Sequence, residues 1–492
     1  MRYGIVRTTA AVLATAATLA GCGDRLLRPG LHPSLSVAAP AAAPSRYFVV
    51  FKGNGVPSDF GARVAALGGQ VESSYGAVGV ATVTGLTGTA ATALASDAKV
   101  QMVSADSTFR LDDRMAFGQA ASADAVGAPG IESQTNPTTA YFYPRQWDYG
   151  AIDAPAAWSA GFLGSPSVRV AILDTGIDPT YIDLVGLVDL AHSTSFVPSD
   201  DPLIAAFFPG ASPITDLEGH GTHVASTVSS RALAVAGVTS RTTLMAVKVL
   251  GATGSGAYSA IFRGIMYATD NGADVINMSL GSDFFKRQSP GAAAAINRAV
   301  GYAATRGVTV VVAAGNDAID YDHTPNLYGI FCSNPQVICV SATGPDSSAT
   351  VNGPYFPSLD AFAIYSNYGT SAVDVAAPGG NFRLAPDGSL SSAVFVWQAC
   401  SRTALIYDEA TNTFTPSICA QYPQFTFTLG AIGTSMAAPH VSGLAALLVE
   451  RYGRNPARIR AAIEQSAADL GKPGVDPFYG KGRIDVAGAV MR

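Results

Sequence analysis

The sequence predicts an α/β protein with a mostly parallel sheet, preceded by a small α+β domain. Two observations support this prediction. Between residues 146 and 492, short apolar segments alternate with segments of helical period, the order typical of a parallel sheet covered by helices on both faces. Residues 46–111 form a separate block of short strand and helix patterns. With 492 residues, 48% hydrophobic and 13% charged, the chain can build more than one core.

The first 22 residues predict an export signal rather than part of the fold. MRYGIVR carries two arginines, and the apolar run that follows, TTAAVLATAATLA, is short for a membrane span. The segment LAGC at 19–22 resembles the bacterial lipobox, in which the cysteine is lipidated and becomes the new N-terminus. The alternative is a plain signal peptide with an incidental cysteine. The place of Cys22 at the end of the apolar run favours lipidation.

Residues 23–45, rich in Pro and Ala, would then be a tether between the lipid and the folded protein. Gly23 follows the cysteine where an Asp would signal inner-membrane retention in Gram-negative lipoproteins. We therefore expect a protein of the cell envelope, at the outer membrane, or a secreted protein if Cys22 is not lipidated.

The cysteines predict disulfide bonds. Apart from Cys22 the chain has four, and an even number in an exported protein suggests pairing. Nearest-neighbour pairing is the simplest of three connectivities and would join Cys332 to Cys339 and Cys400 to Cys419. The alternative is four buried thiols.

Within residues 46–111, strand and helix patterns alternate. RYFVVFKG predicts a strand, PSDFGARVAALGG a helix, VESSYGAVGVATVTG further strand, TAATALASDAKV a helix and VQMVSAD a last strand. Residues 112–140 hold many small residues and prolines and little periodicity. We therefore expect residues 112–145 to be an exposed linker, a typical cleavage zone.

The larger block, 146–492, begins near Gln146 and continues with alternating elements. SVRVAILDTG, TTLMAVKVL, ADVINMSLG and VTVVVAAGN predict buried strands, and the segments between them predict helices. Ligands of such sheets bind at the carboxyl ends of strands. Three polar residues end these apolar runs: Asp174, Ser279 and Asn316.

Each candidate residue has a structural alternative when considered alone. Ser435, in GTSMAAPHV before an apolar helical run, could be a helix N-cap or a nucleophile. Asp174 could serve only in a turn, and Asn316 could cap a turn or donate its amide to an oxyanion. His220 and His223 are spaced i, i+3 in EGHGTHVA, without the HExxH pattern of a zinc site, and His223 could be structural.

Together these motifs resemble the subtilase family of serine peptidases. The order Asp174, His220, Ser435 is the subtilisin order, and AILDTGID, GHGTHVA, AAGN, DVAAPG and GTSMAAPHV resemble family motifs over residues 146–492. The resemblance implies a subtilisin-like three-layer sandwich and a serine endopeptidase acting through an acyl-enzyme. His220 would act as the base for Ser435, Asp174 would orient His220, and Asn316 would bind the oxyanion.

The same resemblance implies a substrate cleft with two walls. Ser279, Leu280 and Gly281 would form one wall and pair with the substrate backbone. Gly254, Ser255 and Gly256 would form the other, an edge strand that accepts an extended peptide; the alternative for these three is a simple glycine loop.

Residues 46–111 resemble, by position and pattern, the inhibitor-type propeptide of subtilases, which assists folding and blocks the active site. The resemblance therefore implies a self-processing zymogen. We expect the cut between Asp112 and Ala140.

A metal is not required for this chemistry, but a structural calcium ion is one expectation. Asp374, with carbonyl groups near Pro335 and Val337, resembles a weak calcium site of some subtilases, and oxygen ligands suit calcium. The alternative is that Asp374 caps a turn.

Two segments depart from the family pattern. Residues 380–432 are long and hold two cysteines, so they could form a disulfide-stapled hairpin at the cleft rim or a surface decoration. Residues 192–218 mix acidic SDDP with apolar LIAAFFPG, for which the sequence suggests no reason.

The expected partners are polypeptide substrates and the chain's own propeptide, acting on a monomer. A formal net charge of -6 and the lack of a basic run argue against nucleic-acid binding. Two other functions compete: an inactive subtilase-like binding protein, against which the intact motifs argue, and an esterase, against which the absence of GxSxG around Ser435 argues.

Overall fold

The structure is a computed structural model that describes residues 37–38, 45–111, 114–122, 134–281, 283–285, 289–324, 326–345, 358–381 and 394–492. The predicted signal segment 1–22, with Cys22, lies outside these residues, as do most of the predicted tether and parts of the predicted linker.

A mostly parallel sheet forms the centre of the large domain. Its strands follow the order β17-β16-β14-β12-β8-β10-β9, and β18 also pairs with β16. Neighbours are parallel except β16 and β17. The strands are β8 (Arg169–Asp174), β9 (Thr194–Ser195), β10 (Thr243–Lys248), β12 (Val275–Met278), β14 (Thr309–Ala313), β16 (Val337–Gly344), β17 (Ala361–Phe362) and β18 (Val375–Pro378).

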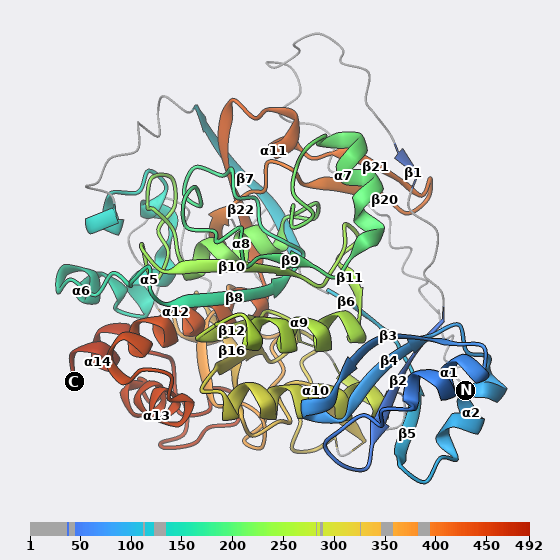
Figure 1. The fold of residues 1–492 in the computed structure, drawn as a ribbon. Helices are drawn as coiled ribbons and strands as arrows, with labels where there is room; N and C mark the ends of the chain where they lie inside the picture. The colour runs from blue at the N-terminus through green and yellow to red at the C-terminus, as the bar shows by residue number, and fades with distance from the viewer. Residues whose placement is uncertain are drawn as a thin grey trace, which may run out of the picture. The chain divides into compact units, whose positions relative to one another are not determined.

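Helices cover both faces of this sheet (Figure 1). In β8, Val170 and Ile172 belong to the core that includes residues of α8 (His220–Val228) and α12 (Thr434–Tyr452). The alternate residues Ala171 and Leu173 belong to the core of α9 (Tyr258–Asp270) and α10 (Pro290–Thr305). Successive side chains of a strand point to opposite faces of the sheet, so both faces of these strands are buried. The predicted α/β fold is confirmed.

The large domain begins earlier than the sequence predicted. Phe142 is buried in the core of α8 and α12, and the backbone N–H of Tyr141 donates to Leu233 O at 2.9 Å. The domain therefore starts near residue 134, not 146. Further helices of this domain are α5 (Trp147–Ala151), α6 (Ala154–Ser159), α13 (Pro456–Ser466) and α14 (Val486–Met491).

Residues 46–105 form an antiparallel sheet, in the order β3-β4-β2-β5, that carries two helices. Alternate residues of its strand β2 again have different partners. Val49 and Phe51 belong to the small domain's own core, whereas the Phe48 ring meets that of Phe262 on α9 edge to face. The elements are β2 (Arg46–Phe51), α1 (Phe60–Ala66), β3 (Gln70–Tyr75), β4 (Val80–Thr84), α2 (Gly88–Ala95) and β5 (Val100–Ala105).

Polar contacts also join the small domain to α9 and α10. The Arg298 guanidinium on α10 donates to the carbonyl oxygens of Val78 and Phe51, both at 2.8 Å. At the N-terminus of α9, Asp106 accepts from the backbone N–H of Ser259 at 3.2 Å and from its hydroxyl at 2.5 Å. A carboxylate at that position satisfies a first-turn N–H and complements the helix dipole.

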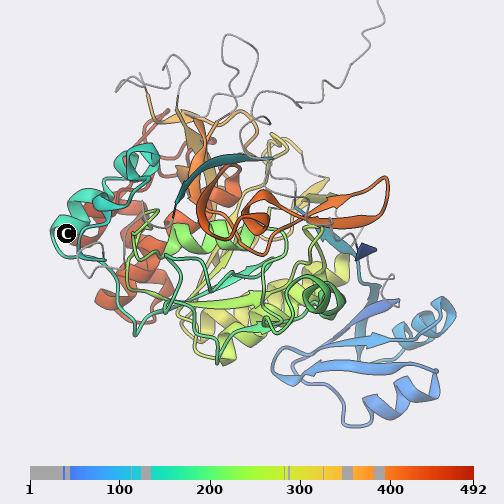
Figure 2. The ribbon, with the colours of Figure 1, turned by 90° about the horizontal axis from the view of Figure 1, so that it is seen from above.

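A second, antiparallel sheet has the order β19-β22-β7 (Figure 1). β19 (Val396–Ala399) and β22 (Phe425–Ile432) come from the segment 380–432, and β7 (Arg114–Ser122) lies in the predicted linker. The prediction of a linker over 112–145 included no strand and missed β7, because the pairing of β7 is made by the main chain, which needs no apolar alternation. In Figure 2, β7 is the teal strand beside the orange β22.

The hairpin of β20 (Leu405–Asp408) and β21 (Thr413–Pro416) explains the mixed composition of residues 192–218. This hairpin is the long orange loop of Figure 2. Leu203 and Ile204 of α7 (Asp201–Phe207) share a small core with Leu405 and Phe414 of the hairpin. Leu203 and Ile204 of α7 are therefore buried against the segment 380–432.

The remaining short elements are peripheral to these sheets. β1 (Val37–Ala38) pairs with β21, and β13 (Asp283–Phe285) pairs with β15 (Leu327–Gly329). α11 (Ile418–Gln421) precedes β22. Across the described residues, no helix combines the length and the apolar character that a membrane crossing needs.

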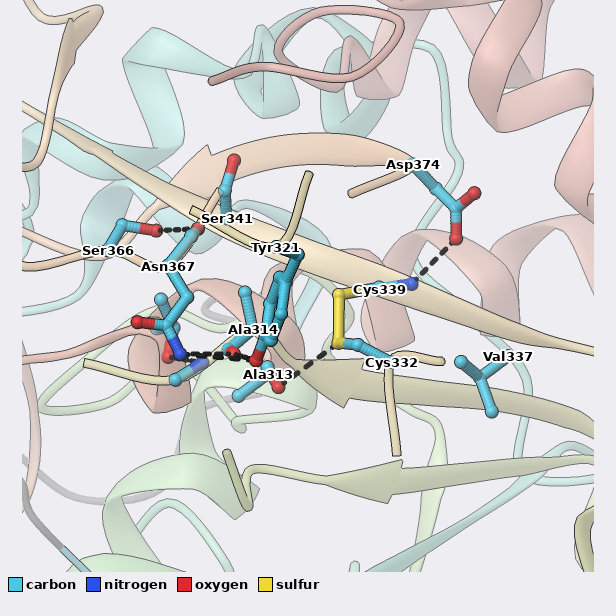
Figure 3. The surroundings of a disulfide bond; sticks show 12 residues. Ala313, Ala314, Tyr321, Cys332, Val337, Cys339, Ser341, Ser366, Asn367 and Asp374 are labelled. Carbon is cyan, nitrogen blue, oxygen red and sulfur yellow. Dashed lines mark hydrogen bonds between the residues drawn. A yellow bond between two sulfur atoms is a disulfide. The ribbon is translucent and has the colours of Figure 1, made fainter. Parts of the chain in front are cut away.

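The cysteines form two disulfides, Cys332–Cys339 and Cys400–Cys419. This is the nearest-neighbour connectivity. The first bond joins β16 to the segment before it, and Figure 3 shows the Cys339 N–H directed at the Asp374 carboxylate, which it reaches at 2.9 Å. The second closes a loop between the end of β19 and α11.

The oxygens expected to bind calcium contact an arginine instead. The Arg460 guanidinium on α13 contacts the carboxylate of Asp374 and donates to the carbonyl oxygens of Pro335 and Val337 at 2.8 and 3.0 Å. Burial raises the pKa of Asp374 to about 6, against the attraction of Arg460, so the carboxylate is charged at neutral pH. These residues do not fit a calcium ion, because the chain supplies its own cation.

Replacing Arg460 should therefore uncover the expected cation site. In a Ser435→Ala background, which prevents self-digestion, Arg460→Ala should lower the free energy of unfolding by about 1–3 kcal/mol, because a partly buried carboxylate loses its partner. Millimolar calcium should restore part of this loss in Arg460→Ala. It should not add stability through this site in the protein that keeps Arg460. Thermal unfolding with calcium and with chelator measures both effects, and exposed Arg458→Ala on the same helix is the control. Equal stability of the two arginine variants would contradict the assignment.

Candidate active site

A buried His–Asp contact lies at the carboxyl edge of the central sheet. Asp174 ends β8 and His220 begins α8, and both side chains are fully buried. Asp174 Oδ1 lies 2.7 Å from His220 Nδ1 and also accepts the backbone N–H of Thr175 at 2.7 Å. Burial raises the pKa of Asp174, while His220 and Thr175 oppose the rise. The contact can hold one tautomer of the imidazole, with Nδ1 directed at the carboxylate.

The buried carboxylate of Asp216 fixes the distance between these two residues. Its Oδ1 accepts the Thr175 hydroxyl and the Gly219 N–H, both at 2.8 Å, and its Oδ2 accepts the Thr222 N–H at 2.8 Å. One side chain thus joins the loop after Asp174 to the first turn of α8, where N–H groups have no helical partner.

A buried lysine also contacts these loops. Lys248 lies directly beside Asp174 in the register of β10 and β8. Its ammonium donates to Thr175 O at 2.7 Å and Thr215 O at 2.9 Å, and lies 2.9 Å from Asp200 Oδ2. Three acceptors satisfy the charge, which would otherwise be costly to bury.

Two other titratable groups flank His220. Glu218 accepts the His220 backbone N–H at 2.8 Å, and burial raises the pKa of Glu218 to about 7. His223 Nε2 lies 3.1 Å from the carbonyl oxygen of Val396 on β19, and burial lowers the pKa of His223 to about 3. His223 is therefore neutral at physiological pH and connects α8 to β19, which supports its structural alternative.

Ser435 lies in the first turn of α12, which packs against α8. Its hydroxyl donates to Ser279 O at 3.0 Å, and the Ser279 hydroxyl donates to Ser435 O at 2.7 Å. Further along α12, His440 Nε2 lies 3.0 Å from Asp148 Oδ2, and both groups are fully buried. The two serine contacts fix the start of α12 against the segment that follows β12, and the His440–Asp148 contact joins α12 to α5.

Asn316 is oriented by the residue before Ser435. Its Oδ1 lies 2.9 Å from both the backbone nitrogen and the hydroxyl of Thr434. Because a backbone N–H can only donate, the carbonyl end of the amide must face Thr434. The position of Nδ2, the donor, is thereby fixed.

The predicted cleft wall at Gly254–Gly256 is an edge strand with a partner. β11 (Ser255–Ala257) pairs antiparallel with β6 (Thr108–Arg110), and the Leu111 N–H donates to Gly254 O at 2.9 Å. At Gly256 a Cβ atom would lie 2.2 Å from Val249 O, so a side chain is excluded there. The observed pairing favours the edge-strand interpretation over a simple glycine loop.

The other predicted wall follows β12. Ser279 contacts Ser435 as described, Leu280 is fully buried, and a Cβ atom at Gly281 would lie 2.3 Å from the Gly315 Cα. The structure therefore brings Ser279 and Gly281 beside the segments that carry Ser435 and Asn316.

A cavity of about 490 Å³ lies between Arg110 of β6, Thr253 before β11, and the strand β20. Two carboxylates line it, those of Glu218 and Glu409, and Arg110 contacts Glu409 at 2.7 Å. The segment 380–432 thus reaches the rim of the site. Among the residues with described positions, no three His, Cys, Asp or Glu side chains are grouped as metal ligands.

Sequence reasoning missed Asp216, Lys248 and Glu218. Lys248 had a signal, since it is the one charged residue within the apolar run TTLMAVKVL and a lone charge in a buried strand needs partners. Asp216 stood close before a helix start, where acidic residues are favoured. Neither signal indicated which groups these side chains would contact.

Comparison with known proteins agrees with this geometry. Residues 165–482 match the subtilase family. The chain is 31% identical to subtilisin E of Bacillus subtilis (strain 168), over 80% of this chain and 87% of that protein. It is 32% identical to thermitase of Thermoactinomyces vulgaris, over 72% of this chain and 99% of that protein.

Among solved structures, the epidermin leader peptide processing serine protease of Staphylococcus aureus has a similar fold. Its TM-score is 0.64 at 22% identity, with 91% of this chain and 98% of that chain covered. The fold, the family match and the two relatives lead to one conclusion: the chain belongs to the subtilase family and is a subtilisin-like serine peptidase.

Proposed function

We propose that the protein is an exported serine endopeptidase whose nucleophile is Ser435. The observation that carries this proposal is the buried contact of His220 with Asp174. His220 lies on α8, and α8 packs against α12, the helix that carries Ser435. His220 Nε2 takes the hydroxyl proton as Ser435 Oγ attacks a peptide carbonyl, and returns it to the leaving amine. Water then hydrolyses the acyl-enzyme. Asp174 stabilises the imidazolium that forms in each step.

The Asn316 amide and the Ser435 N–H bind the oxyanion of the tetrahedral intermediate. Thr434 supports this role, because it holds Asn316 Oδ1 and so directs the donor before substrate arrives. Donors fixed in advance need no reorganisation when charge develops. The mechanism uses side chains and backbone alone and requires no cofactor.

Polypeptides bind in extended form between β11 and the segment Ser279–Gly281. The support for this arrangement is the chain's own segment 108–111, which is antiparallel to β11. Main-chain pairing recognises the backbone of any extended peptide, as an endopeptidase requires.

Residues 46–111 act as the propeptide, an intramolecular inhibitor in a self-processing zymogen. Three contacts support this role: the pairing of β6 with β11, Asp106 at the start of α9, and Arg298 against the carbonyls of β2 and its neighbours. The expected cut between Asp112 and Ala140 includes residues 112–113 and 123–133, outside the described residues.

Export and lipid anchoring at Cys22 are part of the proposal and rest on the sequence. Two disulfides support an oxidising compartment, since such bonds persist outside the cytosol. The active protein is proposed to be a monomer.

Self-processing gives the first test. Wild type should lose about the first 110 to 140 residues, whereas Ser435→Ala should keep its propeptide because no nucleophile can cut it. Intact mass of both proteins, expressed side by side, measures this. Glu450→Ala, an exposed residue on the same helix, is a control that should process normally. Two full-length products would overturn the self-processing zymogen, and processing of both would place the nucleophile elsewhere.

The oxyanion role gives a second test. Asn316→Ala should lower kcat by about 100- to 1000-fold, the range measured for loss of one such donor in subtilisin, and should change KM little. Asn316→Asp should be at least as poor, because it keeps an acceptor for Thr434 but faces the oxyanion with a charge. Thr434→Ser keeps both contacts to Asn316 and should stay within a few-fold of wild type. A raised KM with unchanged kcat would show that Asn316 only binds substrate.

A further inference from the structure

The strand that leads to Ser435 has two partners, one on each edge. β22 ends at Ile432, and Gly433 and Thr434 connect it to Ser435. β19 pairs with one edge and β7 with the other, both antiparallel. Along the second edge, the register runs from Ile432 opposite Arg114 to Phe425 opposite Ser122.

Two described segments that are close in sequence, 108–111 and 114–122, therefore pair with strands on two sides of the site. β6 runs toward the site along β11 and ends beside Gly254, which bonds Leu111. β7 runs away from the site along β22, beginning opposite Ile432. Three extended residues, from Leu111 to Arg114, span at most about 11 Å. Leu111 is thus bonded to Gly254, before β11, and Arg114 lies opposite Ile432, three residues before Ser435.

We propose that the edge of β22 is a binding site for the residues that follow the scissile bond. An extended polypeptide adds to this edge as a strand over about eight residues, and β7 occupies the edge in the full-length chain. The inference rests on the proposed function and names its substrate class: extended, unfolded polypeptides or long tails, rather than short peptides.

The strand β22 is held in place by neighbouring residues. The disulfide Cys400–Cys419 connects the end of β19 to the helix before β22. The Tyr181 hydroxyl donates to Phe427 O at 3.0 Å, and Leu429 is buried. A preformed edge does not lose conformational freedom when a peptide binds, so its hydrogen bonds contribute more fully to affinity.

The occupant of this edge stays attached after a cut between Leu111 and Arg114. Residues from Gln134 onward belong to the large domain, since the Ser240 hydroxyl donates to Gln134 O and Phe142 is in the core. β7 would then compete with substrate from within the same molecule, at high effective concentration. A second cut after Ser122 would relieve this competition.

The test compares peptides copied from the chain itself. Quenched fluorescent peptides of residues 108–115 and 108–122 share the same start and differ in the length beyond the cut. The enzyme is prepared with the double substitution Ala116→Pro/Phe117→Pro in its own β7 and is assayed after processing. In an antiparallel pair, every second residue donates its N–H to the neighbouring strand. Two consecutive prolines therefore remove at least one N–H that β7 donates to β22. Ala116→Val/Phe117→Val keeps both N–H groups and is the matched control.

With the proline pair, kcat/KM should be at least about 10-fold higher for the longer peptide, since several main-chain hydrogen bonds are added. N-methylation of single residues beyond the cut should lower kcat/KM by about 3- to 10-fold at every second position. If β7 is retained after processing, which intact mass shows, the valine control should discriminate less between the two peptides. Equal kcat/KM for both peptides, or effects of N-methylation that do not alternate along the peptide, would overturn the inference. Hydrolysis of casein that depends on Ser435 would show in the same experiment that the proposed function still holds.

Hydrogen exchange tests whether β7 occupies the edge of β22 even if the protein has no peptidase activity. In full-length Ser435→Ala, the backbone amides of Phe425–Ile432 should exchange hydrogen slowly. The proline pair should speed their exchange at alternate positions, and the valine control should not. Unchanged exchange with the proline pair would show that β7 does not occupy this edge and would overturn the inference even in an inactive protein.

Discussion

The carboxylate of Asp216 is the contact on which the active site depends. A parallel sheet brings the ends of its strands to one edge, but it does not fix the loops that leave them. Asp216 bonds Thr175, next to Asp174, and also Gly219 and Thr222, on either side of His220. The Lys248 ammonium holds the same loops through carbonyl groups. The His–Asp contact is therefore the product of a buried polar network rather than of two side chains alone.

The second constraint is that the site must hold an extended chain along both of its sides. The subtilase core supplies β11 on one side, and the segment 380–432 contributes β22 on the other. The chain's own residues 108–111 and 114–122 occupy both edges. If these edges bind substrate as proposed, this pairing would block both of them before processing, in addition to the contacts that residues 46–106 make with α9 and α10.

Much of the fold could be predicted from the sequence because its signals are local. The apolar runs of β8, β10, β12 and β14 predicted the strands, and Asp174, Ser279 and Asn316 each stood at the end of a run. Contacts between distant segments gave no such signal. Asp374 was expected to bind calcium, and Arg460, 86 residues later, could not be foreseen as its partner. β7 was missed because its pairing is made by the backbone of a glycine-containing segment with no clear apolar alternation. Asp216 was missed because its partners come from two separate segments, one after β8 and one at the start of α8.

Covalent labelling is the most direct test of whether Ser435, activated by His220, is the nucleophile. The processed protein is treated with a fluorophosphonate, digested with trypsin and mapped by tandem mass spectrometry. We predict one adduct, on Ser435, formed rapidly in the processed wild type and not in a His220→Ala protein from which the propeptide has been cut and removed. An adduct on another residue, or equal labelling of Ser435 without His220, would contradict it.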